Sequence, residues 1–399
     1  VAALKPDVLI LQETGDNSGN GTGTGVDTVG NLTTTLQLML YGGSDPFRGG
    51  AVGAYVQKYD AAVELPHIFV STVTDNYNRN VILSRWPFAD LNGDTVSQRS
   101  DIPLVIPDAY APGGTGGIRG FMFAEIDLPD EWYAGDLVIG NAHLKAGSTS
   151  SDQTDRERAA RNVAYYIDHL FNGAGTGIPD PYGKILDSPP AQTILDPHTP
   201  VVIGGDWNED ELNNGRKGPA EWLTCAAEIG GTDGTDRDRS DLTYDAAVNP
   251  YNGQRQTFGS TSKLDYIAWQ DSIATARREF TFYSAGLPAT TWMPLELRGF
   301  SNPPLASALA SEPRPVIGDA VLPAAAPATL RGDANCDGVV DTADIDAFVT
   351  AVVAGPGAWA ALTGAGCEFL AACDINDDGV VDTADIDGFV AAVVGGGCP

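Results

Sequence analysis

The chain has 399 residues, with 53 acidic and 23 basic side chains, and its net charge is −30 at pH 7. This length exceeds one typical domain, and the charge argues against a protein that binds nucleic acid constitutively. A metal-dependent nuclease stays compatible with the charge, because a bound ion can make a local site positive. No stretch approaches the roughly twenty apolar residues that a membrane span needs.

Short apolar runs bounded by Gly, Pro or Asp follow one another through the first part of the chain, as expected of strands covered on both faces. We predict strands at 7–12, 51–57, 67–73, 80–85, 120–128, 137–144, 201–208 and 263–269. Helices are predicted at 31–41 and 154–171, the second with Thr154 or Asp155 as its N-cap. This order favours an α/β fold with two stacked mixed β-sheets flanked by helices.

Polar side chains lie where several of these apolar runs end. Because strand ends meet at one edge of a sheet, we expect these side chains to share a rim. Carboxylate, amide and imidazole groups suit a magnesium-assisted reaction at phosphate. The residues are Glu13, Asn141, His143, Asp206, Asn208 and Asp265.

Six segments, in the same order, resemble signatures of the endonuclease/exonuclease/phosphatase superfamily. They are KPDVLILQET, NRNVILSRWP, GIRGFMFAEIDLP, IGNAHL, GGDWN and SKLDYIAW, and the resemblance spans residues 1 to about 322. It implies a four-layer α/β sandwich and a phosphodiesterase or nuclease that depends on Mg²⁺ or Mn²⁺. The substrate is left open.

The resemblance also implies a role for each site residue. Glu13 and Asp265 would serve the metal, Asp206 would activate the attacking water, and Asn208 would orient the phosphate. His143 would contact or protonate a phosphate oxygen, with Asn141 beside it in the catalytic set. Arg79 and Arg119 are candidate phosphate clamps, because a guanidinium can pair two phosphate oxygens.

Two departures from the family pattern leave a second function open. Ser311, Glu312 and Pro313 stand where the family has Ser-Asp-His, so proline replaces the expected histidine. The chain also starts at VAALKP, after the place of the family's first strand. We therefore expect that strand to come from an N-terminal extension or from another subunit. The alternative function is an inactive extracellular scaffold, or a fibre built by strand donation between subunits.

Residues 323–331 read as an Ala/Pro linker, and an acidic duplicated module follows at 332–399. Its segment DGVVDTADIDAFV at 337–349 returns as DGVVDTADIDGFV at 378–390. Oxygen-bearing side chains occupy positions 1, 3, 5, 9 and 12 of two calcium loops, and glycine occupies position 6. The predicted ligands are Asp333, Asn335, Asp337, Asp341 and Asp344 for one Ca²⁺, and Asp374, Asn376, Asp378, Asp382 and Asp385 for the other.

The loops resemble dockerin type I modules, with no convincing helix before either loop. This resemblance implies attachment to a cohesin-like or other protein partner. Four cysteines fall in this part of the chain, and they suggest two disulfides, an oxidising compartment and an extracellular protein. They are Cys336, Cys367, Cys373 and Cys398.

Overall fold

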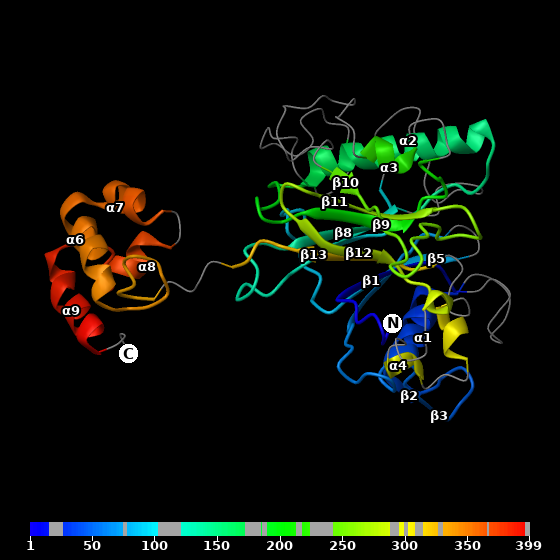
Figure 1. The fold of residues 1–399 in the computed structure, drawn as a ribbon, viewed down its shortest axis with the longest axis horizontal. Helices are drawn as coiled ribbons and strands as arrows, with labels where there is room; N and C mark the ends of the chain where they lie inside the picture. Colours follow the sequence, from blue (N-terminus) through cyan, green and yellow to red (C-terminus); the bar gives the residue numbers. More distant parts are fainter. Residues whose placement is uncertain are drawn as a thin grey trace. The chain divides into compact units, whose positions relative to one another are not determined.

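The computed structural model describes residues 1–15, 27–74, 78–102, 121–171, 185, 190–212, 218–223, 242–287, 295–298, 302–307, 314–325, 330–364 and 367–395. The chain forms two compact units (Figure 1). The first unit comprises Val1–Pro129 and Gly135–Pro323, and the second comprises Asp130–Ala134 and Ala324–Pro399.

A six-stranded sheet with the order β10-β11-β9-β8-β7-β6 forms the centre of the first unit. Its strands are β6 (Gln98–Arg99), β7 (Phe121–Ile126), β8 (Leu137–His143), β9 (Val201–Asp206), β10 (Leu242–Tyr244) and β11 (Asp265–Gln270). The β8–β9 pair is parallel, and the other neighbouring pairs are antiparallel. Its strands β7 and β8 are buried throughout, as their continuous apolar runs predicted.

A second sheet has the order β1-β5-β4 and comprises β1 (Val8–Thr14), β4 (His67–Val70) and β5 (Arg79–Ser84). Two two-stranded sheets are separate from it: β2 (Gly42–Ser44) with β3 (Ala51–Gly53), and β12 (Thr275–Thr281) with β13 (Val316–Val321). Within the described part of the chain, β1 pairs as a strand with β5 alone and β13 with β12 alone.

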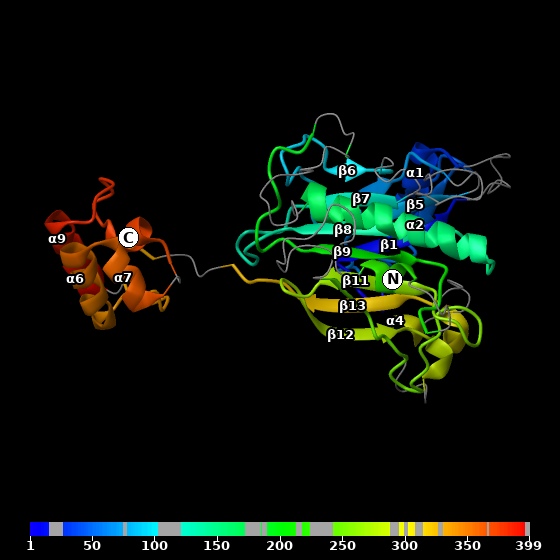
Figure 2. The same cartoon turned by 90° about the horizontal axis from the view of Figure 1, so that it is seen from above.

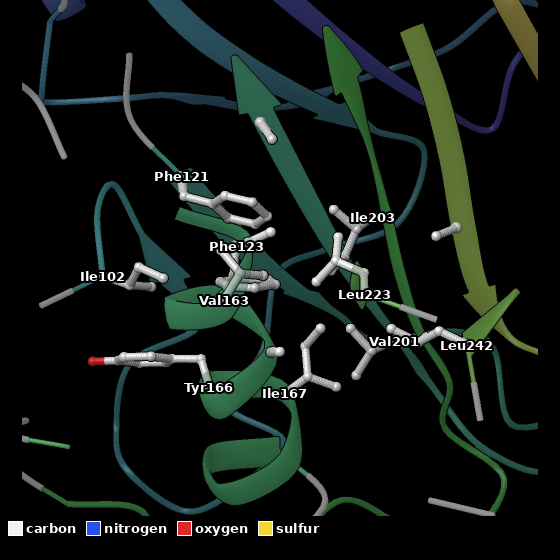
Figure 3. Packing of buried hydrophobic residues seen from close by; sticks show 14 of the residues in the cluster. Ile102, Phe121, Phe123, Val163, Tyr166, Ile167, Val201, Ile203, Leu223 and Leu242 are labelled. Carbon is white, nitrogen blue, oxygen red and sulfur yellow. The ribbon is translucent and has the colours of Figure 1, made fainter. Parts of the chain in front are cut away.

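Helices cover the strands on two sides (Figure 1), and the view from above shows α2 lying across the strands (Figure 2). The helix α2 (Ser150–Tyr166) continues into a π-helix (Ile167–Phe171), and their apolar side chains pack against Phe121, Phe123 and Val201 of the six-stranded sheet (Figure 3). The helix α1 (Val29–Tyr41) packs its leucines on the sheet that contains β1. Shorter helices are α3 (Pro219–Leu223), α4 (Leu295–Arg298), and the 3-10 turns Ser284–Gly286 and Pro303–Leu305.

The second unit is helical. Each duplicated segment forms a 3-10 turn followed by a helix: Thr342–Asp344 with α6 (Ile345–Ala354), and Thr383–Asp385 with α9 (Ile386–Gly395). The helices α7 (Pro356–Thr363) and α8 (Phe369–Cys373) lie between them in the chain. The repeated phenylalanines Phe348 and Phe389 stack with ring centroids 3.8 Å apart, so the two halves share one core.

The mixed α/β class is confirmed, and most predicted elements are present; several strands are shorter than predicted, whereas both predicted helices begin earlier. The strand predicted at 51–57 ends at Gly53, and the one at 67–73 ends at Val70. The prediction of Thr154 or Asp155 as the N-cap of the long helix was wrong. Thr149 caps α2, because its hydroxyl accepts the amide of Asp152 while the Asp152 carboxylate accepts the amide of Thr149.

The cysteine and helix predictions for the acidic module also need correction. A disulfide joins Cys336 to Cys367, but Cys373 is a free thiol buried in the core of the second unit, so the pairing of all four cysteines was wrong. Cys398 lies outside the described residues. Helix α8 directly precedes the second loop, contrary to the expectation that no helix would.

Candidate active site

The ends of β8, β9 and β11 bring three of the predicted residues together. His143 and Asp206 are register partners in the parallel pair β8–β9, and Asp206 faces Asp265 in the antiparallel pair β9–β11. The imidazole Nε2 of His143 lies 3.7 Å from Asp206 Oδ2 and 3.8 Å from Glu13 Oε1 of the neighbouring sheet. The predicted rim is therefore a compact cluster with His143 between two carboxylates.

Glu13 and Asn208 reach the cluster from unusual backbone conformations. Their φ angles are +52° and +54°, a left-handed region that side-chain-bearing residues seldom adopt. Glu13 lies where the register of β1 against β5 shifts between Leu11 and Thr14, and such a bulge re-aims a side chain. The side chain of Glu13 remains 54% exposed, which leaves it open to a ligand at the rim.

The glycine before Asp206 is required by the close approach of β9 to β8. Gly205 has a φ of +141°, and a Cβ there would stand 1.9 Å from the carbonyl oxygen of Ala142. Any side chain would push the two strands apart at the level of the cluster. The GGD segment thus sets the position of the Asp206 carboxylate.

Asp265 is the most buried carboxyl of the cluster. Burial raises its pKa well above the ordinary value, and repulsion from Asp206 raises it further. Its Oδ2 has no hydrogen-bond partner in the described part of the protein. A cation beside this oxygen would relieve both costs.

Asn141 is placed beneath the cluster rather than on its surface. It is completely buried, its Nδ2 donates to the carbonyl oxygens of Leu11 and Val81 at 2.9 Å, and its Oδ1 accepts from Gln12 at 2.7 Å. These bonds connect β8 to β1 and β5, the strands of the second sheet. The structure gives Asn141 a role in holding the strand that carries Glu13.

Arg79 does not point a free guanidinium at the cluster. Its Nε donates to the carbonyl of Asp27, and its Nη1 donates to the carbonyls of Ser71 and Thr72, all at 2.8–2.9 Å. These bonds join the chain segments around β4 and β5, which is a structural use of the side chain. Arg119, the other predicted clamp, lies outside the described residues, as do Ser311, Glu312 and Pro313.

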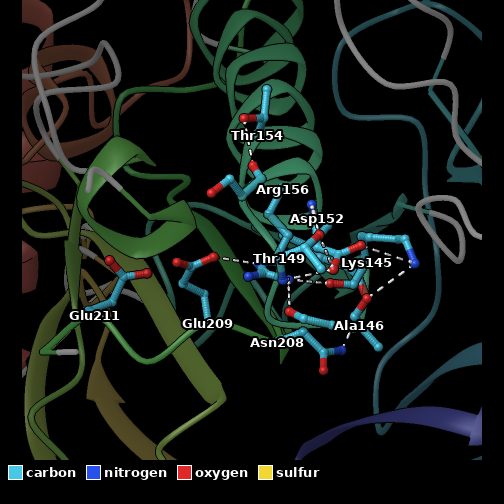
Figure 4. Close-up of polar contacts among 12 residues, drawn as sticks. Lys145, Ala146, Thr149, Asp152, Thr154, Arg156, Asn208, Glu209 and Glu211 are labelled. Carbon is cyan, nitrogen blue, oxygen red and sulfur yellow. Dashed lines mark hydrogen bonds and ion pairs between the residues drawn. The ribbon is translucent and has the colours of Figure 1, made fainter. Parts of the chain in front are cut away.

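A buried ion pair that the sequence analysis missed joins the loops that follow β8 and β9 (Figure 4). Arg156 of α2 pairs with Glu209 and donates to the carbonyl oxygens of Lys145 and Gly147 at 2.7 and 2.8 Å. Asn208 Nδ2 donates to the carbonyl of Leu144 at 3.1 Å, which adds a direct bond between the same loops. The signal was present: Arg156 shares the buried helix face of Ala159, Ala160 and Val163.

The sequence matches the model of the endonuclease/exonuclease/phosphatase family over residues 1–301. The chain belongs to this family. Among the curated proteins, no sequence is similar enough to count as a match.

Solved structures with a similar fold show low identity to this family member. The human Nocturnin catalytic domain with bound sulfate is 11% identical, covers 80% of this chain and 81% of its own, and has a TM-score of 0.37. Sphingomyelinase C from Streptomyces griseocarneus is 14% identical, with coverages of 69% and 75% and a TM-score of 0.35. A beta toxin mutant from Staphylococcus aureus with bound magnesium ions is 11% identical, with coverages of 69% and 74% and a TM-score of 0.35. The family assignment rests on the match over residues 1–301 alone.

Across the described ranges, no group of three or more His, Cys, Asp or Glu side chains is arranged to hold a metal ion. The same ranges contain no helix long and apolar enough to cross a membrane.

Proposed function

We propose that the first unit is a metal-dependent phosphodiesterase of the endonuclease/exonuclease/phosphatase family. The observation that carries this proposal is the placement of His143 within 4 Å of both Glu13 and Asp206. An imidazole between two carboxylates at a rim is suited to general acid and base work on a phosphoric ester.

Although the described residues contain no preformed group of three ligands, the rim offers the carboxylate oxygens that a hard divalent cation prefers. Glu13 offers an exposed carboxylate, and Asp265 offers a buried carboxylate oxygen without a partner among the described residues. These two side chains would hold Mg²⁺ or Mn²⁺, with Asp206 close by. Such an ion would polarise a phosphoryl oxygen and offset the negative charge that develops on it.

Three side chains of the cluster would carry out the proton transfers and orient the phosphate. Asp206, whose Oδ1 accepts the amide of Asn208 at 2.8 Å, keeps Oδ2 toward His143 and would take a proton from the attacking water. His143 would give a proton to a phosphate oxygen or to the leaving group. Asn208, fixed by its bond to Leu144, would orient the phosphate.

Turnover of a phosphodiester tests this proposal directly. The full chain should hydrolyse bis(4-nitrophenyl) phosphate with Mg²⁺ or Mn²⁺ present, and Asp206→Asn should lower kcat by two to four orders of magnitude. Asp319→Asn is a matched control, because Asp319 is a β13 carboxylate that pairs with Arg277 on the surface. Equal rates in all three proteins would reject Asp206 as the base.

Absence of turnover in the unsubstituted chain would favour the alternative, an inactive extracellular scaffold. The sequence supports it through Pro313, which can neither accept a proton nor donate a hydrogen bond. In this alternative, we propose that the subunits assemble by strand donation, with the edges of β1 and β13 accepting the donated strand. Size-exclusion chromatography with light scattering tests this form: a monomer at all concentrations rejects it.

We propose that the second unit binds two Ca²⁺ ions through the duplicated loops. Position 6 is glycine in both, with φ of +85° at Gly338 and +86° at Gly379. Asp344 and Asp385 are completely buried, and their carboxylates accept amides of their own loops, so each is directed inward. Calcium should raise the melting temperature of the full chain, and Asp344→Ala and Asp385→Ala should each remove one site.

We propose that this second unit attaches the protein to a cohesin-like partner outside the cell. Each repeat helix exposes a row of apolar side chains at a spacing of four residues, which lie on one helix face. The rows are Ile345, Val349 and Val353 on α6, and Ile386, Val390 and Val394 on α9. The Cys336–Cys367 disulfide supports the oxidising compartment.

Substitution of the exposed rows tests attachment. Val349→Asp alone should leave binding of a purified cohesin domain nearly unchanged if either row suffices, and Val349→Asp with Val390→Asp should abolish it. Val321→Asp on β13 is the matched control, because Val321 is equally exposed but lies in the first unit. Undiminished binding by the double variant would reject these rows as the interface.

A further inference from the structure

A tight turn directly before β11 brings a threonine side chain to Asp265. In residues 256–262, called the 256–262 turn below, the amides of Thr257 and Phe258 both donate to the carbonyl oxygen of Ser262, at 2.9 and 3.0 Å. The chain therefore folds back on itself just ahead of the strand that carries Asp265, and Thr257 lies beside the start of that strand.

The Thr257 side chain is the contact between this turn and Asp265. It is 1% exposed, and its Oγ1 accepts the amides of Leu264 and Asp265 at 2.9 and 3.2 Å. Burial raises the pKa of Asp265, and a hydrogen bond from the same hydroxyl to the Asp265 carboxyl opposes that rise. Thr257 thus holds both the main chain and the side chain of Asp265, while Oδ2 keeps no partner among the described residues.

Arg314 holds the 256–262 turn on both sides of Thr257. Its Nη1 donates to the carbonyl oxygen of Gln256 at 3.0 Å, and its Nη2 donates to that of Gly259 at 3.3 Å. The main-chain amide of Arg314 donates to the carbonyl oxygen of Thr257 at 2.8 Å. Three carbonyl oxygens of the turn therefore accept from one residue, which lies 55 positions beyond Gly259 in the chain.

Tyr283 orients the guanidinium of Arg314. The Arg314 Cζ lies 4.1 Å from the centroid of the Tyr283 ring. A planar guanidinium can stack on an aromatic face and still donate hydrogen bonds from its edge, which a lysine ammonium cannot do. The segments that carry the two side chains are also bonded directly, because the amide of Phe282 donates to the carbonyl oxygen of Pro315 at 2.9 Å.

We propose that Arg314 is a positioning residue of the candidate active site. By holding the turn on both sides of Thr257, it sets the place of the Asp265 carboxyl beside Asp206 at the rim. It acts through Thr257 and not on the phosphate. This inference rests on the function proposed for Asp265, but the contacts that lead from Arg314 to Asp265 do not.

Loss of the guanidinium should misplace the Asp265 carboxyl rather than remove it. The carbonyl oxygens of Gln256 and Gly259 would turn to water, and the turn would be free to shift away from the start of β11. Replacing a residue that orients a metal ligand typically costs about 10- to 100-fold in metal affinity or activity. We expect about tenfold weaker binding of Mn²⁺ and an about tenfold lower kcat, with KM little changed because Asp265 serves the ion and not the substrate.

Binding of Mn²⁺ by the full chain tests the inference without turnover. Calorimetry of the unsubstituted chain and of Asp265→Asn identifies the ion that depends on Asp265. Arg314→Met should weaken the binding of that ion about tenfold, and Arg314→Lys, which keeps the charge, should weaken it less. Thr199→Val is the matched control: Thr199 is 1% exposed, and its Oγ1 accepts the amide of Asp136 at 2.8 Å, before β9 and at the opposite end of that strand from Asp206.

A double-variant cycle tests the path through Thr257. Thr257→Val should weaken Mn²⁺ binding by at least as much as Arg314→Met, because it removes the contact on which the arginine acts. Adding Arg314→Met to Thr257→Val should then cause no further loss, since two changes on one path are not additive. Additive losses would show that Arg314 does not act through Thr257 and would overturn the inference.

Hydrogen exchange of the metal-free chain measures the positioning itself. The amides of Leu264 and Asp265 donate to Thr257, so Arg314→Met should speed their exchange about tenfold while the amides of β8 keep their rates. Thr199→Val should leave the amides of Leu264 and Asp265 as slow as in the unsubstituted chain. Equal acceleration throughout the first unit would reveal a general loss of stability and overturn the inference.

The outcomes separate this inference from the proposed function. Equal turnover and equal Mn²⁺ affinity in Arg314→Met and the unsubstituted chain would overturn the inference and leave the function intact. No turnover in the unsubstituted chain would reject the phosphodiesterase, whereas weaker Mn²⁺ binding in Arg314→Met would still support the positioning role. Absence of any Mn²⁺ ion that depends on Asp265 would overturn both.

Discussion

Arg156 and Glu209 form an ion pair in which the two side chains are only 2% and 3% exposed. Arg156 comes from α2, and Glu209 lies three residues after Asp206. Because the guanidinium also holds the carbonyl oxygens of Lys145 and Gly147, the pair fixes the loop after His143 against the loop after Asp206. The spacing of the proposed acid and base thus depends on a contact outside the cluster.

Removing one partner of this pair should be costly. Arg156→Met leaves the Glu209 carboxylate buried without its partner, and we expect a loss of about 3–5 kcal/mol in the free energy of unfolding, measured in urea. Arg158→Met is the control, since Arg158 lies on the same helix with its side chain 40% exposed and should change stability by less than about 0.5 kcal/mol. Similar losses of unfolding free energy in both variants would show that the Arg156–Glu209 pair does not stabilise the two loops.

The hydrogen bonds of Asn141 between the two sheets give a second prediction. Asn141→Asp would place a carboxylate against the carbonyl oxygens of Leu11 and Val81, where Nδ2 now donates. We expect the free energy of unfolding to fall by at least about 2 kcal/mol, because the buried carbonyl oxygens would lose their donor and face a negative charge. Asn252→Asp, in an exposed loop, should be nearly neutral. An equal decrease in melting temperature in both variants would show that the Asn141 side chain does not hold the two sheets together.

Asp101 gives a pH-dependent prediction. Burial raises the pKa of Asp101 to about 7 from an ordinary value of 3.8. Between these values the folded state holds a proton that the unfolded state has lost, so stability falls as pH rises from about 4 to 7. Asp101→Asn should remove this part of the slope and be the more stable protein at pH 8, by at least about 1.4 kcal/mol, the equivalent of one pKa unit. Parallel stability curves from pH 4 to 8 would contradict it.

The cluster could be predicted from sequence because its residues follow strands. Parallel or antiparallel pairing of adjacent strand ends brings His143, Asp206 and Asp265 into register whatever the loops do. The Arg156–Glu209 ion pair could be predicted only in part: the helix pattern places Arg156 on the buried face of α2, but it does not show that Glu209 lies beside it. Nor could Arg79 and Asn141 be separated from the cluster, since the direction of a side chain within a strand end depends on contacts with the other sheet.

The N-cap and cysteine errors have similar causes. The apolar pattern of α2 begins well after Thr149, so the polar first turn was excluded from the predicted helix. Cys373 lies in the apolar core of the second unit, where free cysteines are common, and cysteine count alone does not distinguish that environment from a disulfide.

Thr95, in the loop between β5 and β6, should be a point of strain. Thr95 is an exposed, β-branched residue with a φ of +65°, a conformation that costs about 1–2 kcal/mol outside glycine. Thr95→Gly should therefore raise the free energy of unfolding by about 1 kcal/mol, measured in urea. Thr72→Gly is the control: Thr72 is also an exposed loop threonine but lacks a positive φ, and its replacement should not stabilise. Stabilisation by both would point to a general effect of glycine.

Cys373 should report the opening of the second unit when calcium is withdrawn. Burial raises the pKa of its thiol to about 12, with the carboxylates of Asp385 and Asp344 adding to the shift. Since the thiolate is the reactive form, the folded protein should react with iodoacetamide at pH 8 far more slowly than a model thiol.

Chelation of calcium should unfold the loops, expose the thiol and raise the rate of labelling at least tenfold, followed on the peptide that contains Cys373. Asp385→Ala should label quickly even with calcium present, whereas Asp319→Asn, in the first unit, should label as slowly as the unsubstituted chain. Rapid labelling of the calcium-loaded protein, or no response to chelation, would show that calcium does not hold this core together.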